Sequence, residues 1–161
     1  FNGIKLEAPA ELKLEVPSDA HIPASYVDSE RLRLEAYHKL SAASGEKGSR
    51  AQLELIFQEL EDRYGTAPQE VKNLIEVTEL RQICNRLGLK DVSLVGNQCK
   101  LVPVDLGEAK QVNLAQKYPG LRYLKTAQQL SLPISRDQAG EVLANGDLLD
   151  WIKLVFVDLF D

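Results

Sequence analysis

The chain has 161 residues, of which 44% are hydrophobic and 27% are charged, and its 19 basic and 24 acidic side chains give a net charge of −5. This length and apolar content predict one globular domain with a sizeable core and exclude a disordered chain. Two cysteines are too few for a disulfide scaffold. The acidic balance argues against a dedicated nucleic-acid-binding protein, because phosphate contacts need a basic face.

Membrane insertion and secretion are not indicated by the sequence. No apolar run approaches the roughly 20 residues that a membrane span needs, and the N-terminus lacks the pattern of a signal peptide. We therefore expect a soluble, cytoplasmic protein with no membrane partner. The sequence starts at Phe1 rather than at a methionine, from which we expect either a piece of a longer polypeptide or a processed product.

The N-terminal part carries two near copies of one pattern, at residues 4–9 and 12–17, in which apolar and charged residues alternate before a proline. Residues 12–16 are predicted to form a short strand with one solvated face, and the first copy could form another. An extended loop then leads to Asp28, the expected cap of the first helix.

Apolar residues at intervals of three and four predict a helix over residues 29–43 and a second helix that ends at Tyr64. The small polar segment 44–49 between them reads as a linker. Gly65 stands where a left-handed cap is needed, and Thr66 and Gln69 have the spacing of a capping box. The second and third helices are therefore expected to form a hairpin.

The third helix runs to Gly88 and is apolar on most of its circumference, which predicts the buried centre of the fold. Beyond it, alternating residues flank a Gly96-Asn97 turn and indicate a β-hairpin. The next expected elements are a short helix at residues 109–118 and a second strand pair at 121–125 and 130–134. A polar and mobile loop is expected at 135–146. It leads to an apolar helix at 147–160, which packs on the sheet or on a neighbour. The predicted fold class is α+β: a helical hairpin and a buried central helix packed on a small, mostly antiparallel sheet, with an apolar C-terminal helix.

Residue patterns typical of catalysis and cofactor binding are weak in this chain. Segment 44–49 contains glycines, a lysine and a serine but lacks the spacing of a phosphate-binding loop. His21 and His38 have no ligand partner at metal-binding spacing, so we predict no metal, no cofactor and no catalytic residue. Cys84 and Cys99 are expected in the core, although folding could bring a cysteine and a histidine together, which leaves a small cysteine enzyme as a minor alternative.

The basic segment, residues 109–136, contains five cations and no acid: Lys110, Lys117, Arg122, Lys125 and Arg136. No glycine-rich loop or aromatic platform accompanies them. An ordinary solvated face is the favoured interpretation, and an accessory nucleic-acid-contacting domain is the alternative.

The second helix carries a run of acids without an intervening base, Glu54, Glu59, Glu61 and Asp62. With Leu53 at 0° on a helical wheel, Leu55, Glu59 and Asp62 fall at about 200°, 240° and 180°, opposite the core stripe. An exposed leucine between two carboxylates suits a protein partner that offers arginines and an apolar side chain. The alternative is that these residues form the charged outer face that any surface helix needs.

Several strings of the sequence resemble the C-terminal domain of the bacterial transcription-repair coupling factor (Mfd) family. One string, 59–65 with Pro68, is similar to the signature Glu-Leu-x-Asp-Arg-Phe/Tyr-Gly-x-x-Pro. The others are residues 16–23, 26–27, 30–37 and 80–81, with a looser fit at 111–120. The resemblance implies a tail of a preceding domain or a linker at residues 1–10 and a single domain at 11–161.

Members of this family are ATP-driven DNA translocases that remove stalled RNA polymerase and recruit the excision-repair protein UvrA. The resemblance implies that the C-terminal domain is a non-catalytic clamp on the UvrB-like, UvrA-binding module of the same polypeptide, which it masks. It also implies that Glu59 and Asp62 meet arginines of that module, whereas Leu55 is an addition from the helical wheel. RNA polymerase, UvrA, DNA and ATP would then be partners of other domains of the parent.

Overall fold

The computed structural model describes residues 12–161 and contains five helices and five strands, which confirms the predicted α+β class. The residues before these, including the first copy of the repeated pattern and the expected tail at 1–10, lie outside the described part. In chain order the elements are β1 (Lys13–Glu15), α1 (Glu30–Ala43), α2 (Arg50–Tyr64), α3 (Gln69–Arg86), β2 (Asp91–Val95), β3 (Gln98–Val102), α4 (Glu108–Lys117), β4 (Arg122–Leu124), β5 (Gln129–Pro133) and α5 (Asn145–Phe160).

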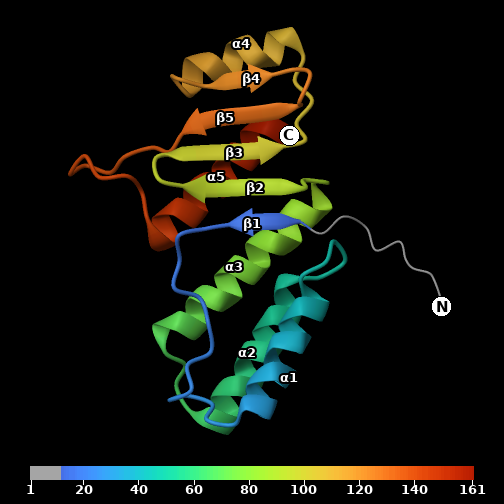
Figure 1. Ribbon diagram of the computed structural model, residues 1–161, viewed down its shortest axis with the longest axis vertical. Coiled ribbons are helices and arrows are strands. Elements are labelled where there is room, and N and C mark those ends of the chain that lie inside the picture. Colours follow the sequence, from blue (N-terminus) through green and yellow to red (C-terminus); the bar gives the residue numbers. More distant parts are fainter. Residues whose placement is uncertain (1–11) are drawn as a thin grey trace, which may run out of the picture.

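The molecule is elongated, with the sheet in its upper half and the α1–α2 pair in its lower half (Figure 1). The sheet has the strand order β1-β2-β3-β5-β4. β1 pairs with β2 in parallel, and the three other pairings are antiparallel, as predicted. The β2–β3 hairpin turns at Gly96, whose φ of 64° explains the glycine there.

The C-terminal helix α5 packs on the sheet, which answers the question that its apolar sequence left open. It runs behind the sheet in Figure 1, and its buried side chains share one core with those of the strands. They are Leu148, Leu149, Trp151, Ile152, Val155, Phe156 and Leu159. None of the described helices is long and apolar enough to cross a membrane.

Helix α3 lies between the two halves and contributes to every core cluster of the described residues. Leu80 and Cys84 belong to the core beneath the sheet, and Val71 and Ile75 belong to the two clusters under α1 and α2. Each of these four side chains is at most 3% exposed. The expectation that the third helix is the buried centre of the fold is thereby confirmed.

Two predicted helix caps are wrong. Ser29, not Asp28, caps α1, because its Oγ accepts a hydrogen bond from the Leu32 amide at 3.3 Å. Helix α3 begins at Gln69 after Pro68 without a side-chain cap, so Thr66 and Gln69 do not form a capping box.

The expected linker, 44–49, ends in a cap that the sequence analysis missed. Ser49 forms a complete capping box with Gln52 at the start of α2. The polar segment 135–146, expected to be a mobile loop, also has internal structure, since residues Arg136 and Val142 form a β-bridge.

Candidate protein-interaction site

The candidate site is the outer face of α2, formed by Leu55, Glu59 and Asp62. Leu55 is 71% exposed, and both acids are also exposed, whereas Leu53 on the opposite side of the helix is fully buried. The helix therefore turns the predicted three side chains outward together. Because each lies three, four or seven residues from the others, they occupy neighbouring positions on one face.

The acids of α2 differ in what they already bind. Glu54 pairs with Arg50 at 2.8 Å, and Oε2 of Glu61 accepts the Ala67 amide at 2.9 Å, which ties down the turn into α3. Glu59 accepts a hydrogen bond from the ammonium group of Lys39 on α1. Asp62 has no cation within 4.0 Å among residues 12–161.

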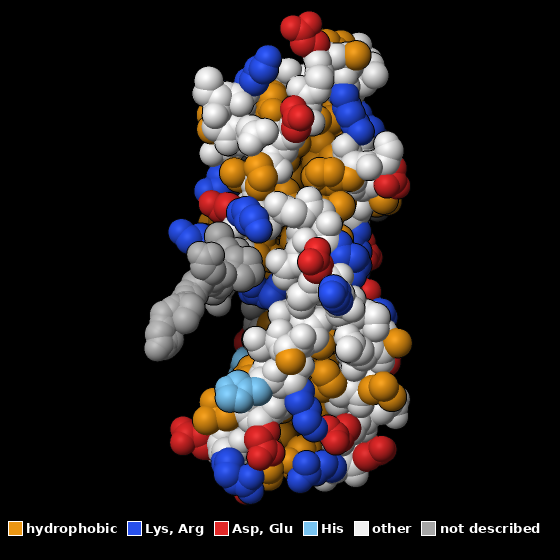
Figure 2. Space-filling view, turned by 90° about the vertical axis from the view of Figure 1, so that its right-hand side faces the viewer, with side chains coloured by type: hydrophobic (Ala, Val, Ile, Leu, Met, Phe, Trp, Pro, Cys, Tyr) orange, Lys and Arg blue, Asp and Glu red, His pale blue; other side chains and the backbone are white. Residues whose placement is uncertain are grey.

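Glu59 and Lys39 form an ion pair between two helices, with 2.6 Å from Nζ to Oε1. The hydrogen bond from Lys39 holds the pKa of the Glu59 carboxyl below its usual value, and the charges of Lys39 and Arg63 act in the same direction. Glu59 is thus ionised at neutral pH. Figure 2 shows side chains of both charge signs at the lower end of the molecule, which α1 and α2 form in Figure 1.

A charge network at the start of α2 holds this helix to the rest of the domain. Glu79 of α3 receives Lys153 of α5 at 2.8 Å and Arg50 of α2 at 3.1 Å. Burial opposes ionisation of Glu79, but the hydrogen bonds and charges of both cations outweigh it and lower its pKa. These ion pairs connect α2 to α3 and α3 to α5, so the helix that carries the outer face is held in a fixed position.

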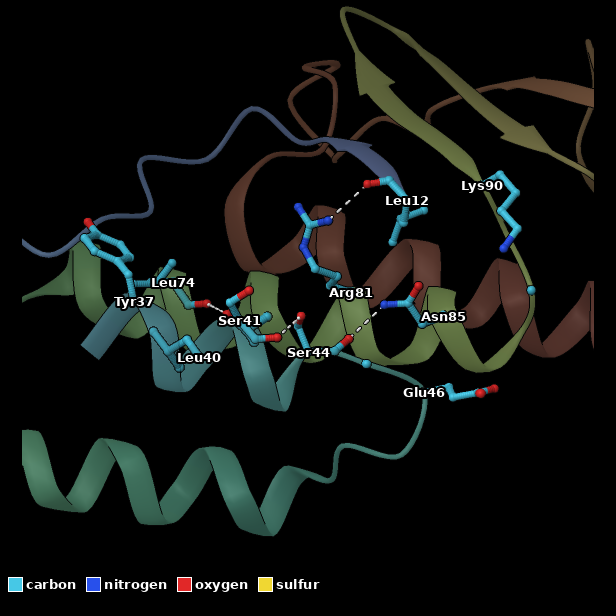
Figure 3. Close-up of a pocket in the computed structure, with 13 residues that line it drawn as sticks. Leu12, Tyr37, Leu40, Ser41, Ser44, Glu46, Leu74, Arg81, Asn85 and Lys90 are labelled. Carbon is cyan, nitrogen blue, oxygen red and sulfur yellow. Dashed lines mark hydrogen bonds between the residues drawn. The ribbon is translucent and has the colours of Figure 1, made fainter. Parts of the chain in front are cut away.

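A hollow of about 790 Å³ lies between the end of α1, helix α3 and the chain that enters β1 and β2 (Figure 3). Arg81 points toward the chain before β1 and donates to the Leu12 carbonyl at 3.2 Å, and Asn85 donates to the Ser44 carbonyl at 2.8 Å. The described residues that line it include no cysteine and no histidine. These polar side chains join elements of the fold rather than assembling a reactive group.

The two cysteines are unsuited to nucleophilic chemistry. Cys84 and Cys99 are both fully buried and free. Burial raises the pKa of the Cys84 thiol to about 12 and that of Cys99 further still. Within the described range there is also no group of three or more potential metal ligands. The position of both thiols in the core agrees with the sequence interpretation.

The basic segment is divided over different elements and partly neutralised. Lys117 pairs with Asp158 at 2.8 Å, and Arg136 donates to the Gly140 carbonyl at 2.8 Å. Lys110 is on α4, Arg122 on β4 and Lys125 in the following turn. These cations do not form one continuous stripe along a single element.

Comparison with known proteins connects this geometry with a family. The family model of the TRCF domain matches residues 16–116, which include α2 and its outer face. This chain belongs to the TRCF domain family. The match confirms the resemblance that the 59–65 string indicated.

Transcription-repair-coupling factors are among the similar curated proteins. The one from Mycobacterium tuberculosis is 37% identical over 131 residues, which are 81% of this chain and 10% of that protein. The one from Escherichia coli is 32% identical over 133 residues, 75% of this chain and 11% of that protein. The TRCF domain described here thus spans about a tenth of the length of these relatives.

A solved structure shares the fold. The crystal structure of a C-terminal domain of transcription-repair coupling factor superposes with a TM-score of 0.61 and covers 93% of this chain and 94% of that one. The two sequences are 20% identical in this superposition, so the likeness bears on the fold alone.

The structure places all three predicted site residues on one TRCF-domain surface, but sequence reasoning missed Lys39. This lysine is distant from Glu59 in the chain, and no helical wheel of α2 can show it. The signal that was available is that α1 precedes α2 by a short linker and must pack against it. A basic residue on the facing side of α1 then has an acidic residue of α2 within reach.

Proposed function

We propose that this domain is a non-catalytic, autoinhibitory interaction module of a bacterial transcription-repair coupling factor. Its docking surface is the outer face of α2, and its partner is the UvrB-like, UvrA-binding module of the same polypeptide. The observation that supports this most is Asp62, an exposed carboxylate with no cation within 4.0 Å among residues 12–161, next to the 71% exposed Leu55 on a fixed helix. Both groups are available to a partner.

The chemistry of the surface favours arginine as the partner side chain. A guanidinium offers paired donors that match a carboxylate, and its contacts are worth more once the interface excludes water. Each such charge-assisted contact contributes about 1–3 kcal/mol when desolvated. Leu55 would supply the apolar contact that excludes water around the ion pairs.

The mechanism is competition for one surface. While the outer face of α2 holds the UvrB-like module, UvrA cannot reach that module. Release of the domain uncovers the UvrA-binding surface of the module. The activities of the whole parent, ATP-driven movement on DNA and removal of RNA polymerase, would belong to its other domains in the cytoplasm. This domain needs no cofactor for the proposed role.

The test uses the full-length parent protein and its apparent Kd for UvrA. Asp62→Lys and Glu59→Lys should each tighten UvrA binding by about 5- to 150-fold, because each loses a masking contact of about 1–3 kcal/mol. Glu46→Lys is the matched control, since it reverses an exposed acid outside α2. Unchanged UvrA affinity in both α2 variants would refute the proposed docking face.

A further inference from the structure

Lys39 forms an ion pair with Glu59, one of the two carboxylates that the proposed partner would bind. Its Nζ lies 2.6 Å from Oε1 of Glu59, and the two side chains are 51% and 49% exposed. Arg63 lies close enough to Glu59 to act on its pKa. Within the described part of the chain, the docking face therefore contains one carboxylate that is already paired, Glu59, and one without a cation, Asp62.

The Lys39–Glu59 pair can open at small cost. An ion pair between two exposed side chains is weak, because water and salt screen it and two flexible chains must be held in one geometry. A guanidinium forms two parallel hydrogen bonds with a carboxylate, whereas the ammonium of Lys39 is a single point charge. An arriving arginine can therefore replace Lys39 at Glu59.

A second carboxylate is in position to receive the displaced lysine. Glu35 precedes Lys39 by four residues on α1, the spacing and order at which an acid and a base pair best along a helix. Oε1 of Glu35 accepts Arg31 at 2.9 Å in an exposed pair, and no hydrogen bond within residues 12–161 uses its Oε2. Glu35, Lys39, Glu59 and Arg63 line the same shallow depression between α1 and α2.

We propose that Lys39 is a built-in competitor for the partner's arginine at Glu59 and so sets how tightly the domain docks. This inference rests on the proposed function and adds its regulation. The partner's arginines would engage Asp62 directly, but one that binds Glu59 must displace Lys39 toward Glu35. Masking is then held below its full strength, which keeps the docked state reversible.

The test is again the apparent Kd of the full-length parent for UvrA. Lys39→Gln should strengthen masking and weaken UvrA binding by about two- to fivefold, the range expected for removal of one exposed ion pair. Lys72→Gln is the matched control, because it removes the same charge from an exposed lysine of α3 that has no ion pair among residues 12–161. In a Glu59→Gln background, Lys39→Gln should have no further effect.

The outcomes separate this inference from the proposed function. If Asp62→Lys tightens UvrA binding but Lys39→Gln leaves it unchanged, the domain docks as proposed and the competitor role is wrong. If Lys39→Gln tightens UvrA binding, Lys39 contacts the partner rather than competing with it, which also overturns the inference. A partner-free check is the Glu59 carboxyl pKa measured by NMR, which should rise in Lys39→Gln and stay constant in Lys72→Gln.

Discussion

The substitution Gly48→Ala should destabilise the domain strongly, although the residue lies in the short linker between α1 and α2 and is only half-buried. A Cβ at this position would lie 1.9 Å from the carbonyl oxygen of Ala43 and 2.7 Å from Nε2 of Gln82. Neither atom belongs to a freely movable group, since one is backbone and Gln82 is fully buried. The turn between α1 and α2 must therefore move away from α3.

The cost follows from the contacts that this movement breaks. Nε2 of Gln82 donates to the Ala43 carbonyl at 2.7 Å and to the Ser49 carbonyl at 3.1 Å, which clamps the turn onto α3. Two lost hydrogen bonds cost about 0.5–1.5 kcal/mol each, and a buried donor left unpaired costs about 1–3 kcal/mol. We expect a loss of about 2–4 kcal/mol in the free energy of unfolding, or a fall in Tm of about 5–15 °C.

Urea and thermal denaturation followed by circular dichroism measure this loss, and Gly45→Ala is the control. A Cβ at Gly45 meets nothing within 4 Å, and its φ is not in the left-handed region. That control should change the stability by less than about 1 kcal/mol, with the sign set by the loss of backbone freedom in the unfolded chain. If both alanine variants unfold at the same urea concentration, the clamp by Gln82 does not contribute as described.

Three further predictions concern the charge network, the thiols and the basic segment. Glu79→Gln should lower the free energy of unfolding by about 1–2 kcal/mol at pH 7. Because the pKa of Glu79 is lowered on folding, this difference in stability from wild type should shrink as the pH falls below about 4.5. Urea melts at a series of pH values measure it. Cys84 and Cys99 should react with a thiol reagent only after denaturation, and rapid labelling of the native protein would contradict their burial. The isolated domain should show no salt-sensitive binding to DNA in low-salt anisotropy titrations, and binding there would favour the nucleic-acid alternative for the basic segment.

The outward face of α2 could be predicted because a helical wheel depends only on backbone periodicity. Leu53 and Leu55 are close in the chain and point to opposite sides, which follows directly from about 100° of rotation per residue. Lys39 could not be found in this way. Its contact with Glu59 depends on the packing of α1 against α2, and a wheel contains no information about neighbouring helices.

The capping error at Thr66 has a local physical cause. A hydroxyl three residues before Gln69 matches the capping-box pattern, in which Thr66 would accept the amide of Gln69. The helix begins only at Gln69, with Pro68 in the capping position, so Thr66 lies too far before the first turn to cap it. Pro68 also lacks the amide hydrogen that a cap at Thr66 could otherwise have bonded.

The central position of α3 means that the domain cannot be divided at the visible boundary between its helical and sheet halves. In the piece 12–88, a cut after Gly88 would expose the side of α3 that carries Leu80 and Cys84. It would also remove from the sheet the helix that covers one of its faces together with α5. Neither piece would retain a closed core. The two halves should therefore fold as one unit, and the family match, residues 16–116, includes residues on both sides of this boundary.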